Sequence, residues 1–532
     1  MKSKRKIIIS ILIIAFVVMS VLATIAIVFA LTQQTVKTSL NINYQATQVS
    51  AKVSASVIYA DGTEESMITP NGNASSITFK ADDTPDPNGS TLIPLSAINL
   101  TSSEKYVVFK YTFENTGGNQ FVATFDYLDT ETEDSNMTLS YSTTGEDYKP
   151  TLNSLLVEGL KTKSYYIKLE INNVSFDAEF SGAISWVLNS DIIVATPETA
   201  QSILDSNIND KTIVFKDGSY DTKLYLRASR ETSLAYLWDA ENSTRGEAVA
   251  DPTTIPTTTY LVYTRDISNV TFLATEDAIF TSQIVFDSRK IWNLSEWYDV
   301  VRDKATNNFY QQMKLTNVTF NGLTFEGENG RITMKAASDD YSEISNIEVS
   351  NCSFKTTSIE NPEMKSGAIL VETTNGEKLN KGFVIKNNHI EGHYKGFDTR
   401  GIGDVTIVGN TFKNLVHHGV TLLSYATTAQ DRGFITITGN TFDTCWDTAA
   451  ENNNDFYNYG QYGVRLQYML NTEITISNNN FKNVNKQMIK GTTMNNCTYT
   501  FTNNYYDGEK VADTSGVSAA SSGTVEILRP AK

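Results

Sequence analysis

One stretch of the 532-residue chain combines several residue types that carry out acid–base chemistry: KGFDTRGIGDVTIVGNTFKNLVHHGV, residues 395–420. Asp398 and Arg400 lie two residues apart within it. All four histidines of the chain fall between positions 389 and 418, namely His389, His393, His417 and His418. Carboxylate, imidazole and guanidinium groups that meet on one surface can move protons to and from a substrate. The stretch is therefore either an active site or the polar exterior of a repeat.

The repeat that would position these residues has an apolar first and sixth position around polar turn residues. IVGNTF (407–412) and ITGNTF (437–442) are typical copies. The fourth position is asparagine in the last five copies: Asn388, Asn410, Asn440, Asn479 and Asn504. Variable spacing above a minimal repeat predicts a β-solenoid with loops inserted in some coils. Stacked coils would bring these side chains to ~4.8 Å, as a ladder of hydrogen-bonded amides.

A second column follows each copy: GFDTR (396–400), GVTLL (419–423) and GVRLQ (463–467). Side chains alternate between the two faces of a strand. We therefore expect Phe397 and Thr399 to point inward and Asp398 and Arg400 to point outward, with Arg465 in the outward row of Asp398. Two coils span only ~10 Å, so one sugar-sized ligand could contact several of these side chains. Candidate ligand-binding residues beside them are His393, Lys395 and His417.

The repeat resembles the right-handed parallel β-helix superfamily, the pectate-lyase-like fold, over residues 196–525. The resemblance implies an active site on an outward sheet face, with Arg or Lys as the base in lyases and paired Asp in hydrolases. GFDTR…HHGV is also similar to the mannuronate epimerases through Asp398 and His418-Gly419, although Thr399 and Arg400 depart from their Asp-Pro-His-Asp strand. The candidate catalytic residues are Asp398, Arg400, His418 and Arg465. Arg400 or His418 would be the base, Asp398 would orient it, and Arg465 would neutralise a uronate carboxylate.

A structural alternative exists for the same residues. Asp398 beside Arg400 or Arg465 could be a surface ion pair, worth ~0–1 kcal/mol. Histidines in a turn, such as His417 and His418, are more often solvated than catalytic. On this interpretation the stretch is two coils of a scaffold.

The longest interval between repeats contains ENNNDFYNYGQYG (451–463), which we expect to project as a loop. Its aromatic residues would form a platform for sugar rings, with amide groups around it. They are Phe456, Tyr457, Tyr459 and Tyr462. The alternative is a loop that is packed by its own aromatic residues.

The N-terminal residues differ from the rest. A basic flank precedes IIISILIIAFVVMSVLATIAIVFAL (7–31), which contains no charge. Twenty-five helical residues would span roughly 37 Å, more than the ~30 Å hydrocarbon core. We predict a transmembrane anchor in residues 1–31, with the basic end in the cytoplasm and the rest outside the cell. A cleaved signal peptide, which would make the protein secreted, is the alternative.

Between the anchor and the repeat, alternating segments such as VVFKYTFEN (107–115) and FVATFDYL (121–128) predict a β-sandwich over residues 36–190. A hydrophobic segment that leads into such a domain resembles the layout of the camelysin-type surface proteins of Gram-positive bacteria. TPETAQSILDSNIND (196–210) predicts a short helix that covers the open N-terminal end of the solenoid.

The net charge and the cysteine positions limit which partners, metal sites and disulfides can be expected. The formal net charge is −17, and without residues 1–31 it is −21. Nucleic acid is excluded as a partner because phosphate binding requires a basic surface. Cys352, Cys445 and Cys497 are far apart, so they indicate neither a disulfide framework nor a metal site, and no motif predicts a cofactor.

Together these patterns predict an all-β protein with an N-terminal transmembrane helix, a β-sandwich and a right-handed parallel β-helix. The favoured function is adhesion or glycan interaction at the bacterial cell surface without catalysis. The alternative is a carbohydrate-active enzyme that acts on the outward sheet face around residues 393–465. A polysaccharide lyase or uronate epimerase ranks before a glycoside hydrolase. The expected partners are the membrane, through residues 7–31, and a glycan.

Overall fold

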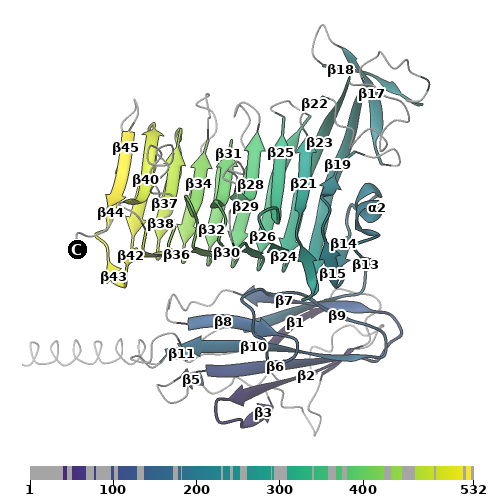
Figure 1. Ribbon diagram of the computed structural model, residues 1–532, viewed down its shortest axis with the longest axis vertical. Coiled ribbons are helices and arrows are strands. Elements are labelled where there is room, and N and C mark those ends of the chain that lie inside the picture. Colours follow the sequence, from purple (N-terminus) through teal and green to yellow (C-terminus); the bar gives the residue numbers. More distant parts are fainter. Residues whose placement is uncertain are drawn as a thin grey trace, which may run out of the picture.

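The computed structural model describes most of the chain as β-strands (Figure 1). Residues described are 40–44, 51–66, 77–79, 98–100, 106–128, 137–171, 178–180, 183–228, 232–239, 244–251, 254, 261–288, 290–292, 308–337, 341–357, 367–373, 380–424, 433–445, 462–484, 487–518 and 523–528. The predicted anchor in residues 7–31 lies outside these ranges. Among the described residues, no helix is long and apolar enough to cross a membrane.

The N-terminal part consists of two main sheets. One sheet has the order β1 (Leu40–Tyr44), β12 (Ala183–Asn189), β7 (Phe121–Leu128) and β9 (Leu155–Val157). The other has the order β3 (Glu64–Ser66), β2 (Ala51–Tyr59), β6 (Tyr106–Asn115), β10 (Thr162–Ile171) and β8 (Met137–Ser142), with β4 (Ile77–Phe79) also paired to β2. A small sheet joins β5 (Ile98–Leu100) to β11 (Ala178–Phe180). Phe125 of the first sheet packs against Tyr141 of the second at 6.1 Å between ring centroids, so the two sheets share a core.

The C-terminal part is a parallel β-helix with three sheets, which we call sheets I, II and III. Sheet I contains β13 (Ile192–Ala195), β14 (Thr212–Phe215), β19 (Leu261–Ala274), β23 (Asn308–Asn321), β26 (Glu343–Ser350), β29 (Lys381–Lys386), β32 (Asp404–Val408), β35 (Phe434–Thr438), β38 (Glu473–Ser477), β41 (Thr498–Thr502) and β44 (Thr514–Val517). Three further strands extend its early part: β17 (Leu234–Asp239), β18 (Thr244–Val249) and β22 (Lys290–Trp292).

Sheet II is formed by short strands. They are β15 (Gly218–Tyr220), β20 (Ala278–Phe280), β24 (Thr324–Glu326), β27 (Ser353–Lys355), β30 (His389–Glu391), β33 (Thr411–Lys413), β36 (Thr441–Asp443), β39 (Asn480–Lys482), β42 (Tyr505–Tyr506) and β43 (Glu509–Lys510). Sheet III contains β16 (Leu224–Leu226), β21 (Gln283–Ser288), β25 (Arg331–Ala336), β28 (Gly367–Thr373), β31 (Lys395–Arg400), β34 (Val420–Leu423), β37 (Tyr462–Gln467), β40 (Gln487–Met494) and β45 (Gly523–Leu528).

Each coil therefore has three strands, whereas the sequence pattern indicates only two. The strand that the pattern does not reveal is the one in sheet II, for example Thr411–Lys413. Three residues are too few to display a periodic pattern, so this segment is hidden between the asparagine turn and the next strand.

The asparagines lie at the turn between sheets I and II and are hydrogen-bonded from coil to coil. The Asn388 amide donates to Asn410 Oδ1 at 2.9 Å, and the Asn410 amide donates to Asn440 Oδ1 at 2.9 Å. The same bond joins Asn440 to Asn479 and Asn479 to Asn504, at 3.0 Å each. Cys352 stands one coil earlier, and its backbone N–H donates to Asn388 Oδ1 at 3.0 Å. All of these polar groups are buried and paired, as an interior turn requires.

The interior is filled by columns of stacked side chains. One aromatic column lies so close to the start of the sheet III strands that it limits which residue can stand there. The rings of Phe412, Phe442 and Phe481 stack at 5.0 and 4.8 Å between centroids. A Cβ atom on Gly419 would lie 2.5 Å from the Phe442 ring. Glycine at this position therefore lets the sheet III strand pass directly over the aromatic column.

Both ends of the β-helix are covered. Helix α2 (Ala200–Asp205) covers the N-terminal end, where Ala200 and Leu204 join the interior core. The Gln201 side chain accepts from the backbone N–H of Tyr225 and donates to its carbonyl, at 2.8 and 3.1 Å. At the other end β43, β44 and β45 pair antiparallel with the last coil. These additions cover the sheet edges that would otherwise pair with another chain.

The outward surface of sheet II has alternating charges along successive coils. The positions in register are Glu326, Lys355, Glu391, Lys413, Asp443 and Lys482. Lys413 lies 3.6 Å from Glu391, and Lys482 lies 3.8 Å from Asp443. Opposite charges on neighbouring strands are favourable cross-strand pairs.

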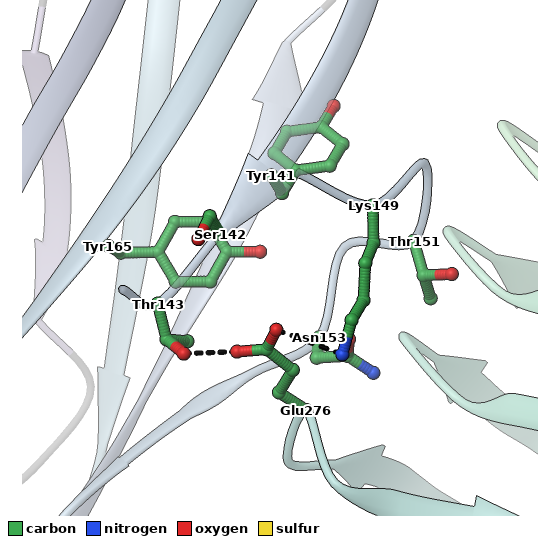
Figure 2. Close-up of a pocket in the computed structure, with 8 residues that line it drawn as sticks. All are labelled: Tyr141, Ser142, Thr143, Lys149, Thr151, Asn153, Tyr165 and Glu276. Atoms are coloured by element: carbon green, nitrogen blue, oxygen red, sulfur yellow. Dashed lines mark hydrogen bonds and ion pairs between the residues drawn. The ribbon is translucent and has the colours of Figure 1, made fainter. Parts of the chain in front are cut away.

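The sandwich is fixed to the early coils of the β-helix through buried polar contacts. The Asn153 amide donates to the carbonyl of Gly322 at 2.7 Å, and the Ser154 backbone N–H donates to the carbonyl of Ala274 at 2.9 Å. Figure 2 shows Glu276 of the β-helix between Thr143, whose hydroxyl donates to it, and Lys149 at 3.1 Å. The two parts are thus joined by specific hydrogen bonds as well as by the chain.

Candidate active site

The outward surface of sheet III has a nearly buried ion pair at its middle. On β31, Phe397 and Thr399 are fully buried in the interior, and Asp398 lies on the other side. Lys395 Nζ donates to Asp398 Oδ2 at 2.9 Å, and the two side chains are only 15% and 10% exposed. The exposed pair that the sequence suggests between Asp398 and Arg400 or Arg465 is wrong, because Lys395 is the partner and the pair is enclosed.

A second carboxylate lies on the neighbouring strand. Glu372 of β28 is in register with Arg400 of β31, and Arg400 Nη1 lies 3.3 Å from Glu372 Oε1. Lys335 of β25 approaches the other oxygen at 3.5 Å. The Glu372 side chain is 22% exposed, so it keeps access to solvent. Two cations thus hold this carboxylate in place.

Asp398 and Glu372 differ in burial, since Asp398 is the more enclosed of the two. Burial raises the pKa of Asp398, and the nearby Glu372 charge raises it too, against the opposing effect of Lys395 and Arg400. Asp398 is thus a buried carboxyl group with a raised pKa, and Glu372 on the adjacent strand is a more exposed one. Two carboxyl groups in different environments can take the roles of an acid and its partner.

His418, which precedes β34 (Val420–Leu423), is fully enclosed. Its Nδ1 accepts from the backbone N–H of Tyr462 at 3.0 Å, which places the hydrogen of the neutral ring on Nε2. Burial holds the pKa of His418 well below its usual value, and His417, Lys395 and Arg465 lower it further. Its ring stacks on Tyr462 at 5.1 Å between centroids. Because none of its surface is exposed, His418 does not fit the role of a base that meets the substrate.

Of the other histidines, His417 contacts His418 at 3.8 Å between ring centroids, whereas His393 and His389 pack against other residues. His417 stacks on Tyr394 at 5.2 Å between centroids, and only 4% of it is exposed. His393 lies 6.5 Å from the Phe354 ring, and burial lowers the pKa of His393 to about 3, with a further contribution from Arg331. His389 lies on sheet II, 3.3 Å from Glu391. Direct ligand contact by His393 or His417 would require these nearly enclosed rings to become exposed.

Arg465 and Thr421 continue the row of Asp398. The Cα partners across β31, β34 and β37 are Asp398, Thr421 and Arg465. Arg465 Nη2 donates to Gln467 Oε1 at 2.7 Å, and no carboxylate among the described residues pairs with it. The Thr421 hydroxyl is 1% exposed and makes no hydrogen bond in the described part of the chain.

Of the four aromatic residues predicted to form a sugar-binding platform, the structure describes one, Tyr462. Phe456, Tyr457 and Tyr459 lie outside the described residues. Tyr462 belongs to strand β37 rather than to a loop, and it is 7% exposed. Its place in the platform is therefore wrong, because its ring is packed between neighbouring coils against His418.

The described residues contain no group of three or more His, Cys, Asp or Glu side chains that could hold a metal ion. Cys352, Cys445 and Cys497 are all buried free thiols. Burial raises the pKa of Cys352 to about 12.

Neither a protein-family model nor a curated protein matches the chain, so the likeness to camelysin-type proteins is unsupported. The chain is similar in structure to the catalytic unit of a thermostable GH87 alpha-1,3-glucanase from Streptomyces thermodiastaticus, at a TM-score of 0.27 and 10% identity, over 86% of this chain and 92% of that one. It is also similar to the catalytic domain of a GH87 alpha-1,3-glucanase variant in complex with tetrasaccharides. The TM-score is 0.23 at 13% identity, over 85% of this chain and 88% of that one.

These neighbours correct the favoured function. The sequence patterns favour a surface protein that interacts with glycans without catalysis, whereas the similar structures are catalytic units of glycoside hydrolases. The non-catalytic function is therefore withdrawn. No residue role is transferred from these structures to this chain.

Proposed function

We propose that this protein is a carbohydrate-active enzyme, specifically a glycoside hydrolase, that acts on the outward surface of sheet III. The observation that supports the proposal is the pair Asp398 and Glu372. One carboxyl group is buried with a raised pKa, and the other is a carboxylate held by Arg400 and Lys335 on the adjacent strand. Glycoside hydrolysis in most families requires this combination of an acid and an ionised partner.

In this proposal Asp398 is the general acid. It donates its proton to the glycosidic oxygen as the bond to the leaving sugar breaks. Lys395, at 2.9 Å, then stabilises the carboxylate that forms. Glu372 either attacks the anomeric carbon or activates a water molecule, and its ion pairs with Arg400 and Lys335 hold it in position.

The lyase and epimerase alternatives fit less well. A lyase of this kind needs an Arg or Lys that accepts a proton from the sugar. Lys395 and Arg400 are instead both held in ion pairs, with Asp398 and Glu372. His418, the other candidate base, is enclosed. Neither the cations nor the histidine that the resemblance suggests as the base is therefore free to take that role.

The experiment is an incubation of the purified full-length protein with neutral and acidic glycans. New reducing ends report hydrolysis, and absorbance of unsaturated uronates reports a lyase. We expect reducing ends without unsaturated product. Asp398→Asn and Glu372→Gln should each reduce turnover by roughly 100-fold or more. Lys482→Gln, on sheet II, is the control and should leave turnover unchanged. Unsaturated product, or full activity in both carboxyl variants, would reject the hydrolase.

We also propose that the protein is located at the outer surface of the cell membrane or is secreted from the cell. An anchor in residues 7–31 would hold the enzyme at the outer surface of the cell membrane, where it would meet extracellular glycans. Cleavage within that segment would release it. Membrane fractionation of cells that express the full chain distinguishes the two.

A further inference from the structure

The turns that lead from sheet III to sheet I form one edge of the β-helix, which we call the III–I edge. Glu372 is the second-last residue of β28 and Arg400 is the last residue of β31, so the candidate site reaches this edge. Figure 1 shows the edge at the top of the β-helix, where the hairpin of β17 and β18 rises beyond it. Two exposed tyrosines lie along the III–I edge, one before and one after the carboxyl pair in the order of the coils.

The first of them, Tyr341, lies in the turn between β25 and β26, and 37% of it is exposed. The next residue, Ser342, accepts a hydrogen bond at 2.6 Å from the hydroxyl of Ser288, which is the last residue of strand β21 in sheet III. Tyr341 is therefore held at the III–I edge and not on the outward surface of sheet I.

The β17–β18 hairpin fixes the Tyr341 ring through Arg245. The guanidinium carbon of Arg245 lies 4.2 Å from the centroid of the Tyr341 ring and 4.7 Å from that of Tyr236. Arg245 Nε also donates to Gln312 Oε1 of β23 at 3.1 Å. A cation over an aromatic face is attracted by the ring's quadrupole. An exposed ring is thus held in one place by contacts with the hairpin.

The second tyrosine, Tyr468, directly follows β37 and is 38% exposed. Strand alternation would direct its side chain inward, and Thr373 and Ser424, which occupy the same register position after β28 and β34, are only 5% and 2% exposed. Tyr468 instead has a φ of 57°, a left-handed conformation that is rare for a bulky residue. Backbone strain of this kind is concentrated at functional sites.

We infer that Tyr341 and Tyr468 are stacking subsites for two sugar rings of one glycan chain, which lies along the III–I edge across Asp398 and Glu372. The inference rests on the proposed function, since the carboxyl pair marks the bond that is cleaved. Tyr341 follows β25, one strand spacing before β28, and Tyr468 follows β37, three spacings after it. The sum of four spacings is roughly 19 Å, which is longer than a disaccharide. The substrate is therefore a chain of several sugars that is cleaved internally.

The two rings and the overall charge favour the same class of substrate. Stacking on an aromatic ring uses the apolar face of a sugar and needs no charge on the ligand. A chain with net charge −17 repels polyanions in general. Together they favour a neutral glycan.

The test measures binding separately from turnover. The full-length Asp398→Asn protein is titrated by calorimetry with disaccharides and hexasaccharides of glucose, xylose, N-acetylglucosamine and galacturonic acid. At least one neutral hexasaccharide should bind roughly tenfold or more tightly than its disaccharide. Tyr341→Ala and Tyr468→Ala should each weaken binding of that hexasaccharide by roughly tenfold, whereas the two Tyr→Phe variants should retain it.

A double-mutant comparison tests the positioning role of Arg245. Arg245→Gln should weaken hexasaccharide binding in the presence of Tyr341, and it should have no further effect in the Tyr341→Ala protein. Arg245→Lys keeps a cation near the ring and should restore part of the affinity. Additive losses would mean that Arg245 does not act through Tyr341.

Tyr505→Ala is the matched control, because Tyr505 is 39% exposed but lies on sheet II. It should keep the affinity of the protein with Tyr505 in place. Thermal unfolding of each variant reports whether it is folded.

Three outcomes separate this inference from the proposed function. Hexasaccharides that bind no better than disaccharides, or a loss in Tyr505→Ala as large as in Tyr341→Ala and Tyr468→Ala, would reject the subsites even if the wild-type protein hydrolyses glycans. Tightest binding of the galacturonic acid hexasaccharide would reject the neutral substrate. Length-dependent binding that requires both tyrosines, without hydrolysis of any glycan by the wild-type protein, would support the subsites and reject the hydrolase.

Discussion

Lys395 and Asp398 lie three residues apart on β31, and their side chains meet on the outward side of sheet III at 2.9 Å. The contact depends on a break in the strand's alternation. A Cβ atom on Gly396 would point at the Phe412 ring, 2.4 Å away, and Phe397 is also buried in the interior. Two successive positions therefore face inward, which returns Lys395 to the side of Asp398.

The first prediction concerns activity and pH. Burial raises the pKa of Asp398, so the protonated acid persists to higher pH than in water, and activity should fall as pH rises above that pKa. Lys395→Gln removes a charge that lowers the pKa, so the alkaline limb of kcat/KM should move to higher pH. A limb that stays in place or moves to lower pH would show that Asp398 is not the titrating acid.

The second prediction concerns stability in acid. Burial lowers the pKa of His393 to about 3, so the folded state keeps this ring neutral while the unfolded chain binds a proton below about pH 6.5. The unfolded state then holds more protons, so the free energy of unfolding falls as pH decreases. The contribution of His393 is about 1.4 kcal/mol per pH unit between about 6.5 and about 3.

Urea unfolding at pH 5.0, 5.75 and 6.5 measures this slope. In that range most carboxylates contribute little. His393→Gln should flatten the dependence, most strongly between pH 5.0 and 5.75, where nearly every unfolded chain carries the proton. Identical slopes in the two proteins would mean that His393 binds its proton equally well in the folded and the unfolded state.

The third prediction tests the close approach of sheet III to the aromatic column. Gly419→Ala would place a Cβ atom 2.5 Å from the Phe442 ring, so the free energy of unfolding should drop by roughly 1–3 kcal/mol. Phe442→Leu removes the clash as well as ring packing. In a double-mutant cycle by urea unfolding, Gly419→Ala should therefore cost less in the Phe442→Leu protein than in the wild type. Additive costs would mean that another neighbour causes the strain.

The fourth prediction concerns the junction between sandwich and β-helix. Asn153→Ala removes the bonds to Gly322 and Thr324 and leaves a buried carbonyl without its donor. We expect a loss of roughly 1–3 kcal/mol. Calorimetric unfolding should separate into two transitions, one for each part. Thr162→Ser, on strand β10, is a mild control and should preserve the wild-type profile.

The sequence predicts the solenoid well, because its signals repeat. The asparagine positions and the starts of sheet III strands recur once per coil, and the inward placement of Phe397 and Thr399 follows from simple alternation. The same alternation fails one residue earlier, at Gly396, because glycine has no side chain to show which way it faces. That is why the sequence pattern does not reveal the pairing of Lys395 with Asp398.

The sequence pattern does not predict the second carboxylate of the candidate site, for a different reason. Glu372 comes near the end of β28, and its partners Arg400 and Lys335 belong to strands 28 and 37 residues away in the chain. Only the register between coils brings the three together. Insertions of variable length set that register, and spacing in one sequence does not specify it.

The alternating charges on sheet II have a consequence for how the β-helix assembles. Its later coils are similar enough to substitute for one another, since those of Lys413, Asp443 and Lys482 present the same asparagine turn and the same aromatic stack. A folding chain that skips the Lys413 coil would form equivalent contacts in the next one, but it would set Glu391 against Asp443. Like charges on adjacent strands destabilise such a pairing. The alternation of charges thus distinguishes odd from even coils, and it disfavours misfolded states in which one coil has been left out.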